Sequence, residues 1–424
     1  MLPRTNRATL ASAGSPTTAP ERTSSGDLTV ESPTVPALAV LGRIPARVRV
    51  LLIYLISRGV TFGFFAGVYA VAPVVQLPYA SFGRTRPSLL AFMSAWDGKY
   101  YRQIALHGYP TSLPLDSTGH VVQNAWAFLP VYSWLTRGLM LTTGLGFTPA
   151  GIILSVMFGA AAAALLFRLL APRIGESRAM WSVAFFCLGP MSFIMLMTYA
   201  ESLFIALMFA ALLLIQRRRY LLAAPIGVIA AFTRPGALAI AATIGILFIA
   251  QLVRRESVAV GERVRMIVAG LVITVAGFAW PFIASGVTGQ KNAYFNTELS
   301  WWTLMVGRVQ FIPFAPWFEQ FYHFTGIIGP FVVVGIIVGF IVWMARREMR
   351  VLGDEILAYS GSYGAYLLAT FLPQQSIARL LLPMAPLFGT PLFTRSPRWR
   401  WGILVAFIVL QPGAIASLWF IYPP

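Results

Sequence analysis

The segment 94–110 combines one carboxylate with aromatic and basic side chains, a mixture that can activate a hydroxyl group. Its spacing predicts a short helix at the membrane surface, on which Asp97 and Tyr101 share a face. A carboxylate placed there is a candidate general base, because it can accept the proton of a hydroxyl nucleophile. The alternative is an interfacial anchor in which Asp97 caps the helix or pairs locally with Lys99 or Arg102.

Three further charged residues stand beside apolar segments, where an ionised side chain is costly and usually faces a cavity or a partner. Glu201 is either an acid that favours the start of a helix or a functional group, and both interpretations stay open. Arg234 and Arg379 fall on the side of the membrane that disfavours arginine, which suggests an anionic partner such as a phosphate or Glu201. Arg379 is favoured as the phosphate ligand, because Gln374 and Gln375 add polar groups beside it.

The composition sets the class of protein that must position these residues. Of 424 residues, 58% are hydrophobic and 11% are charged, and the mean hydropathy is +0.73. A chain this apolar is expected to be an all-α, polytopic bundle of transmembrane helices. The net charge of +18 is read as arginine in cytoplasmic loops and not as a nucleic-acid surface. One cysteine, Cys187, and three scattered histidines predict no metal site, no disulfide and no cofactor.

Apolar segments long enough to cross about 30 Å of hydrocarbon begin after a tail, 1–42, that is predicted to be disordered and cytoplasmic. The predicted spans are 48–75, 149–171, 179–197, 201–216, 220–233, 236–253, 265–286, 326–345, 355–372, 379–394 and 401–421. The segment 126–143 is ambiguous by hydropathy. If it does not cross, every arginine cluster falls on one side, so we expect about eleven spans within a membrane domain, 43–424, with a cytoplasmic N-terminus.

This topology places two long connections, 76–148 and 287–325, on the external side together with the charged residues above. The second connection carries aromatic and acidic side chains: Trp301, Trp302, Trp317 and Tyr322, with Glu298 and Glu319. Such aromatics either stack on sugars or isoprenes or form a belt at the membrane interface. Any chemistry is therefore expected at the external face.

Taken in order, several segments resemble the GPI mannosyltransferase 2 (PIG-V-like) family, which belongs to the GT-C class of integral-membrane glycosyltransferases. The matching segments are Trp96-Asp97 with Tyr101, Phe128-Leu129-Pro130-Val131-Tyr132, Tyr199-Ala200-Glu201-Ser202-Leu203-Phe204, Thr233-Arg234, and Arg379 with Pro383 and Pro386. The resemblance covers roughly 50–395. The sequence departs from the family at Gln123-Asn124, where members often carry an acidic residue, and this bears on the acceptor.

The resemblance implies a polyprenyl-phosphate sugar donor, most often mannose, and inverting transfer without a metal. The acceptor would be a glycolipid, a glycan or a protein, and the enzyme would lie in the lipid bilayer of a bacterial plasma membrane. Asp97 would be the catalytic residue. The residues expected to bind substrate are Trp96, Lys99, Tyr101, Arg102, Tyr199, Glu201, Arg234, Gln375 and Arg379.

The alternative function is a lipid or solute transporter that uses Asp97, Glu201 and Arg234 as coupling charges inside the membrane. A transporter concentrates such charges near the middle of the bilayer, in broken helices. In this sequence they gather at one face, beside the long aromatic connections, and this location favours the enzyme.

The topology is testable by cysteine labelling. Cysteines placed in the connections 76–148 and 287–325 should react with an impermeant thiol reagent added from outside. Cysteines placed near Arg217 and Arg346 should be protected, because the arginine bias puts these turns in the cytoplasm. The reverse pattern would contradict both the span count and the external site.

Overall fold

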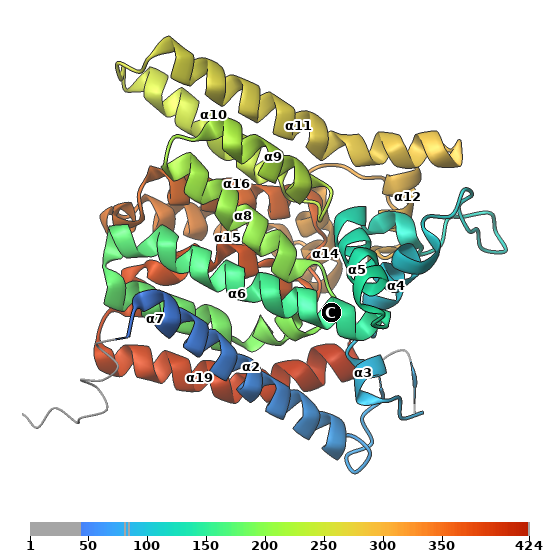
Figure 1. Ribbon diagram of the computed structural model, residues 1–424. Coiled ribbons are helices and arrows are strands. Elements are labelled where there is room, and N and C mark those ends of the chain that lie inside the picture. Colours follow the sequence, from blue (N-terminus) through green and yellow to red (C-terminus); the bar gives the residue numbers. More distant parts are fainter. Residues whose placement is uncertain (1–43, 80–81, 84, 423–424) are drawn as a thin grey trace, which may run out of the picture. The chain divides into compact units, whose positions relative to one another are not determined.

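The computed structural model describes residues 44–79, 82, 83 and 85–422 (Figure 1). In this part of the chain every regular element is a helix, apart from one isolated bridge between Leu115 and Val121. The predicted all-α fold is therefore confirmed. The predicted disordered tail, 1–42, lies outside the described residues.

Among the described residues, five helices are long and apolar enough to cross a membrane. They are α2 (Ala46–Val71), α6 (Phe147–Ile174), α11 (Val260–Thr288), α15 (Ile328–Ala345), and α19 (Pro397–Ile415) continued by the π-helical turn η6 (Ala416–Ile421). On α11 and α15 large apolar side chains such as Val275, Phe282 and Phe331 are exposed. Helices that are apolar on their outer face suit a lipid surface, as expected of a multi-pass membrane protein.

The remaining apolar segments form shorter or broken helices. The short helices are α8 (Glu201–Gln216), α9 (Tyr220–Ala231), α10 (Leu238–Val253) and α16 (Asp354–Thr370). The helix α7 (Glu176–Leu188) and the 3-10 helix η3 (Pro190–Leu196) are bent by 71° and make one broken span or a re-entrant loop. With this pair the described part of the chain has up to six spans by length and composition, so the count of about eleven stays a prediction.

The segment 379–394 differs from the single span predicted for it. It forms three short pieces, α17 (Ile377–Leu380), η5 (Leu382–Gly389) and α18 (Pro391–Thr394). Proline lacks a backbone N–H and clashes with the preceding helical turn. Three prolines in this segment, Pro383, Pro386 and Pro391, therefore prevent one continuous helix.

The ambiguous segment 126–143 begins within the 3-10 turn η2 (Ala125–Ala127) and includes the helix α5 (Pro130–Thr143). With 14 residues, α5 is about 21 Å long, which is less than the hydrocarbon thickness of about 30 Å. Its length therefore favours the interpretation that this segment does not cross. The helix α5 packs against α4 (Gly98–His107), the helix that follows Asp97.

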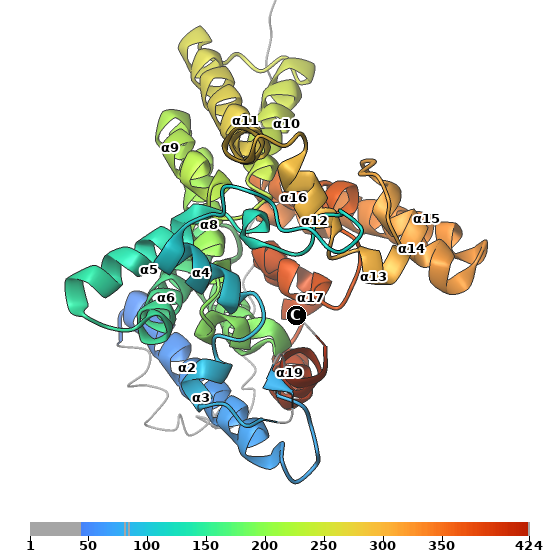
Figure 2. The ribbon, with the colours of Figure 1, turned by 90° about the vertical axis from the view of Figure 1, so that its right-hand side faces the viewer.

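The two ends of the helix bundle carry different segments of the chain. The turns at one end are joined by exposed ion pairs: Arg49–Glu176, Arg173–Glu355, Arg218–Glu262 and Arg254–Asp354. At the opposite end, where α6 begins and α11 ends, α4, α5 and α12 (Ala293–Leu299) lie together (Figure 1). Figure 2 looks onto this second end, which also holds α17. Both long connections thus meet at one end, and the arginine-rich turns gather at the other.

A buried arginine stabilises the bend between α7 and η3. Arg58 lies within α2 and is 5% exposed. It donates to the Cys187 carbonyl oxygen at 2.5 Å and to the Ser192 carbonyl oxygen at 2.6 Å. The last carbonyl groups of a helix have no partner within that helix and carry partial negative charge. Arg58 supplies a donor for one such carbonyl, that of Cys187 at the end of α7, and a second donor for Ser192 in η3, on the two sides of the break at Gly189 and Pro190.

Replacing Arg58 with methionine should lower the free energy of unfolding by about 3 kcal/mol, because two buried carbonyl groups lose charged donors. Thermal unfolding of the purified protein in detergent measures the effect. Arg347→Met is the matched control, since Arg347 is exposed at the arginine-rich end. Equal melting temperatures for the two variants would show that Arg58 does not hold the bend.

Candidate active site

The predicted short helix is present as α4, which ends before Gly108 with that glycine at φ +78°. Tyr101 and Ile104 are buried on one face, as the spacing required. The Asp97 carboxylate makes no capping hydrogen bond to α4. It reaches α17, where its Oδ2 lies 2.7 Å from Nη2 of Arg379. Within the described chain, this contact replaces the local pairing that was the alternative interpretation of Asp97.

Glu201, at the start of α8, holds two arginines at once. Its Oε1 lies 2.6 Å from Nη1 of Arg234 and 3.0 Å from Nη1 of Arg379. Only 3% of Glu201 is exposed, so both contacts are made away from bulk water. In a region of low dielectric constant such contacts are strong, and the carboxylate fixes both guanidinium groups.

This charged cluster is not fully satisfied. Oε2 of Glu201 and Nε of Arg379 are buried without a hydrogen-bond partner among the described residues. Buried polar atoms are nearly always paired in native proteins, and an exception calls for an explanation. Atoms beside a cavity that can still form hydrogen bonds are more typical of a binding site than of a structural salt bridge.

Tyr199 contacts both Asp97 and Arg379 of this cluster. Its hydroxyl accepts a hydrogen bond from the Asp97 backbone N–H at 3.1 Å and donates one to the Ala95 carbonyl at 3.3 Å. The Arg379 guanidinium carbon lies 5.3 Å from the centre of the Tyr199 ring, which is a cation–π contact. Tyr199 therefore orients both partners of the Asp97–Arg379 pair.

The residue before Asp97 is tied to a distant part of the chain. Trp96 adopts φ +55°, a left-handed conformation that costs a non-glycine residue about 1–2 kcal/mol. Its indole N–H donates to the Trp419 carbonyl at 3.0 Å, and the Trp419 indole N–H donates to the Phe92 carbonyl at 2.9 Å. These two bonds fasten the start of α4 to η6 and fix the direction of Asp97.

Arg234 reaches the cavity from the turn between α9 and α10. Gly236 has φ +120° there, and a side chain at this position would lie 3.1 Å from the Tyr366 ring and 3.2 Å from the Phe204 ring. Glycine therefore allows both the backbone conformation and the close packing of this turn.

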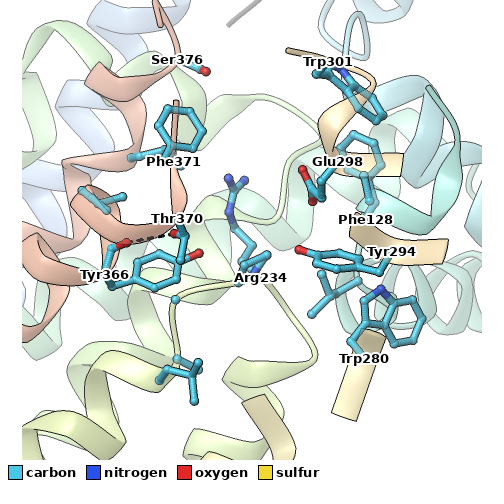
Figure 3. Close-up of a pocket in the computed structure, with 18 of the residues that line it drawn as sticks. Phe128, Arg234, Trp280, Tyr294, Glu298, Trp301, Tyr366, Thr370, Phe371 and Ser376 are labelled. Carbon is cyan, nitrogen blue, oxygen red and sulfur yellow. Dashed lines mark hydrogen bonds between the residues drawn. The ribbon is translucent and has the colours of Figure 1, made fainter. Parts of the chain in front are cut away.

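A cavity of about 340 Å³ opens beside the cluster, within the size range of small-molecule sites. Its lining includes Asp97, Tyr101, Phe128, Arg234, Trp280, Tyr294, Glu298, Trp301, Tyr366, Gln375 and Arg379. Figure 3 shows Arg234 between two walls, with Tyr366 and Thr370 on one side and Tyr294 and Glu298 on the other. Aromatic rings and a few charged groups around one space suit a polar ligand with an apolar face, such as a sugar.

The structure brings together part of the predicted substrate-binding set. Tyr101, Arg234, Gln375 and Arg379 line the cavity, and so does Asp97, the predicted catalytic residue.

Other members of the set lie elsewhere. Tyr199 and Glu201 stand behind the cavity-lining residues and hold them in place. Trp96 packs toward η6. Lys99 and Arg102 are exposed on α4, and the Lys99 ammonium lies 4.7 Å from the centre of the Tyr100 ring.

Glu298 is a cavity residue that the sequence does not predict. It lies on α12, four residues after Tyr294, so the two share a helix face that meets the cavity. Although part of Glu298 remains exposed, burial in the cavity wall raises its pKa to about 7, while Tyr294 and Arg234 oppose this rise. The i, i+4 pair of a tyrosine and a glutamate in an aromatic loop was the only signal of its role.

The sequence matches no protein-family model and no curated protein. Among solved structures, the chain is similar to ArnT from Cupriavidus metallidurans bound to undecaprenyl phosphate, with 14% identity and a TM-score of 0.43. It is also similar to the Archaeoglobus fulgidus oligosaccharyltransferase in complex with Zn and sulfate, with 11% identity and a TM-score of 0.46.

The matches cover 84% and 87% of this chain, but only 60% of ArnT and 53% of the oligosaccharyltransferase. This chain thus spans less than two thirds of either protein. At this level of similarity the two structures assign no function to it, and the function must be argued from its own cavity.

Proposed function

We propose that the protein is a membrane glycosyltransferase that transfers mannose from a polyprenyl-phosphate donor to a hydroxyl acceptor at the external face, with inversion and without a metal. The observation that carries this proposal is the pair of arginines on the cavity wall, held from behind by Glu201. A guanidinium group can hold two phosphate oxygens at once. A lipid-linked donor explains why such a site lies at the ends of apolar helices.

The contacts favour Arg234 over Arg379 as the main phosphate ligand. The Arg379 guanidinium already contacts two carboxylates, those of Asp97 and Glu201. Arg234 contacts one carboxylate, and Figure 3 shows its guanidinium projecting into the cavity. The N–H groups of Arg234 therefore have fewer partners within the described protein and are more available to a ligand. Arg379 would add positive charge beside the same phosphate.

The transfer needs a group that takes the proton of the acceptor hydroxyl. Asp97 lines the cavity and is bonded to Arg379, so it either takes this proton or holds the arginine in place. Activity depends on Asp97 in both cases. The acceptor belongs to the glycolipids, glycans or proteins that present a hydroxyl at the external membrane surface.

The positions of the charges favour this enzyme over a transporter. Asp97 precedes α4, Glu201 begins α8, Arg234 lies between α9 and α10, and Arg379 lies in the short α17. All four therefore stand at or beyond helix ends, beside the external connections. A transporter would bind its cargo near the midpoints of its spans.

The function is tested with membranes from a deletion strain and from its complemented partner, each incubated with labelled polyprenyl-phosphate mannose. A labelled product should form only in the complemented membranes. Complementation with Asp97→Asn should reduce it by about 10² or more, because the change preserves shape and removes the carboxylate charge.

Asp116→Asn is the matched control for this assay. Asp116 is an acidic residue of the same external connection that pairs with Arg308 outside the cavity lining, so this variant should transfer normally. No difference in labelled product between the two strains would contradict the proposed donor. Near-normal transfer by Asp97→Asn would remove Asp97 from the active site.

Binding of the donor to purified protein tests the arginines separately. Arg234→Lys keeps the charge but loses the two-pronged contact, so the Kd for polyprenyl-phosphate mannose should rise about tenfold, equivalent to about 1.4 kcal/mol. Arg379→Lys should weaken donor binding less. Arg308→Lys, outside the cavity lining, should leave it unchanged. If neither cavity arginine affects binding, the phosphate is held elsewhere, with Lys99 and Arg102 as the next candidates.

A further inference from the structure

Inverting transfer places a geometric demand on the cavity. The acceptor oxygen attacks the anomeric carbon from the face opposite the departing phosphate. The group that takes the acceptor proton and the group that holds the phosphate must therefore stand on different sides of the sugar.

Asp97 does not meet this demand well. Its Oδ2 lies 2.7 Å from the Arg379 guanidinium, so this oxygen is in direct contact with a group proposed to face the phosphate. A carboxylate oxygen engaged by a guanidinium is already committed to a charged contact. Its contacts suit a residue that orients an arginine.

We propose that Glu298 accepts the proton of the acceptor hydroxyl and that Asp97 is a positioning residue for Arg379, an assignment that rests on the proposed function. Glu298 lines the same cavity from α12, and Figure 3 shows it on the wall beside Tyr294, across from Tyr366. In the described part of the chain no arginine or lysine lies within 4.0 Å of its carboxylate. Two described carboxylates line the cavity, those of Asp97 and Glu298, and Asp97 is paired with Arg379. Glu298 is therefore the better candidate to accept a proton.

The surroundings of Glu298 suit this role. The titratable and charged groups that face it are Tyr294 on its own helix, Arg234 from the α9–α10 turn, Tyr366 from α16 and Asp97 from the start of α4. A general base works best when its pKa lies near the operating pH, and burial brings Glu298 close to it. The Trp301 ring lies beside it on the cavity lining, where a sugar can stack.

The transfer forms one bond at the anomeric carbon and breaks another. The acceptor oxygen forms a bond to the anomeric carbon, and its proton passes to the Glu298 carboxylate. The bond between the anomeric carbon and the phosphate oxygen breaks, and its electron pair leaves with polyprenyl phosphate. The charge that develops on this phosphate faces Arg234 and Arg379.

The pH dependence of transfer distinguishes the proposed roles of Glu298 and Asp97. Wild-type transfer should rise about tenfold per pH unit below about 7 and level off above it, since a protonated Glu298 cannot accept a proton. The donor is a phosphodiester and does not titrate in this range. Transfer is measured from labelled polyprenyl-phosphate mannose in deletion-strain membranes that carry each variant, and donor Kd is measured on purified protein.

Glu298→Gln should lower transfer by about 10² or more, abolish the rise with pH and leave the donor Kd within about twofold of wild type. Glu298→Asp, which retains a shortened carboxylate, should keep the pH rise at a reduced rate. Asp97→Asn should retain the pH rise while transfer falls and donor binding weakens through Arg379. Glu319→Gln changes a glutamate of the same external connection outside the cavity lining, and should match wild type.

A pH rise that persists in Glu298→Gln, or that disappears in Asp97→Asn, would overturn the assignment and return the base to Asp97. Unfolding temperatures equal to wild type show that these losses are chemical. Should Glu298→Gln not fold, the pH profiles of Glu298→Asp and Asp97→Asn decide the question. Failure of the proposed function is a different result, because the wild-type protein itself would then form no product from this donor.

Discussion

The arrangement of the cavity depends on one carboxylate, that of Glu201. Through a single oxygen it contacts Arg234 and Arg379, which come from segments far apart in the sequence. Arg379 in turn holds Asp97. Among the described residues Glu201 is the one carboxylate paired with Arg234, whereas Arg379 also pairs with Asp97. Loss of Glu201 would therefore leave the Arg234 charge buried and unpaired, at a cost of several kcal/mol. The helix α8, the α9–α10 turn, α17 and α4 are therefore fixed relative to one another by this shared contact.

Charge in an apolar setting made most of this cluster predictable from sequence. Asp97, Glu201, Arg234 and Arg379 stand out because an ionised group beside a membrane helix is costly and needs a partner. The sequence also suggested Glu201 as an anionic partner of Arg234, as the structure shows. Hydropathy likewise predicted the helical bundle, because long apolar helices carry a strong signal.

Other features have no comparable signal in the sequence. Glu298 lies in a connection where acidic residues are ordinary, and only folding places α12 against the cavity. Hydropathy cannot distinguish a continuous span from short pieces interrupted by prolines, so 379–394 was predicted as one helix. Sequence alone assigned no role to Arg58, because the carbonyl groups that it contacts belong to a bend between other helices.

The bonds between Trp96, Trp419 and Phe92 bear on the order of events during synthesis. The segment that precedes α4 leaves the ribosome early, whereas Trp419 and Arg379 follow much later. Until they emerge, nothing holds Trp96 in its left-handed conformation or pairs the Asp97 carboxylate. The nascent chain therefore carries an incomplete cavity while most of its helices are being inserted, and a ligand meets a finished site only after translation has passed η6.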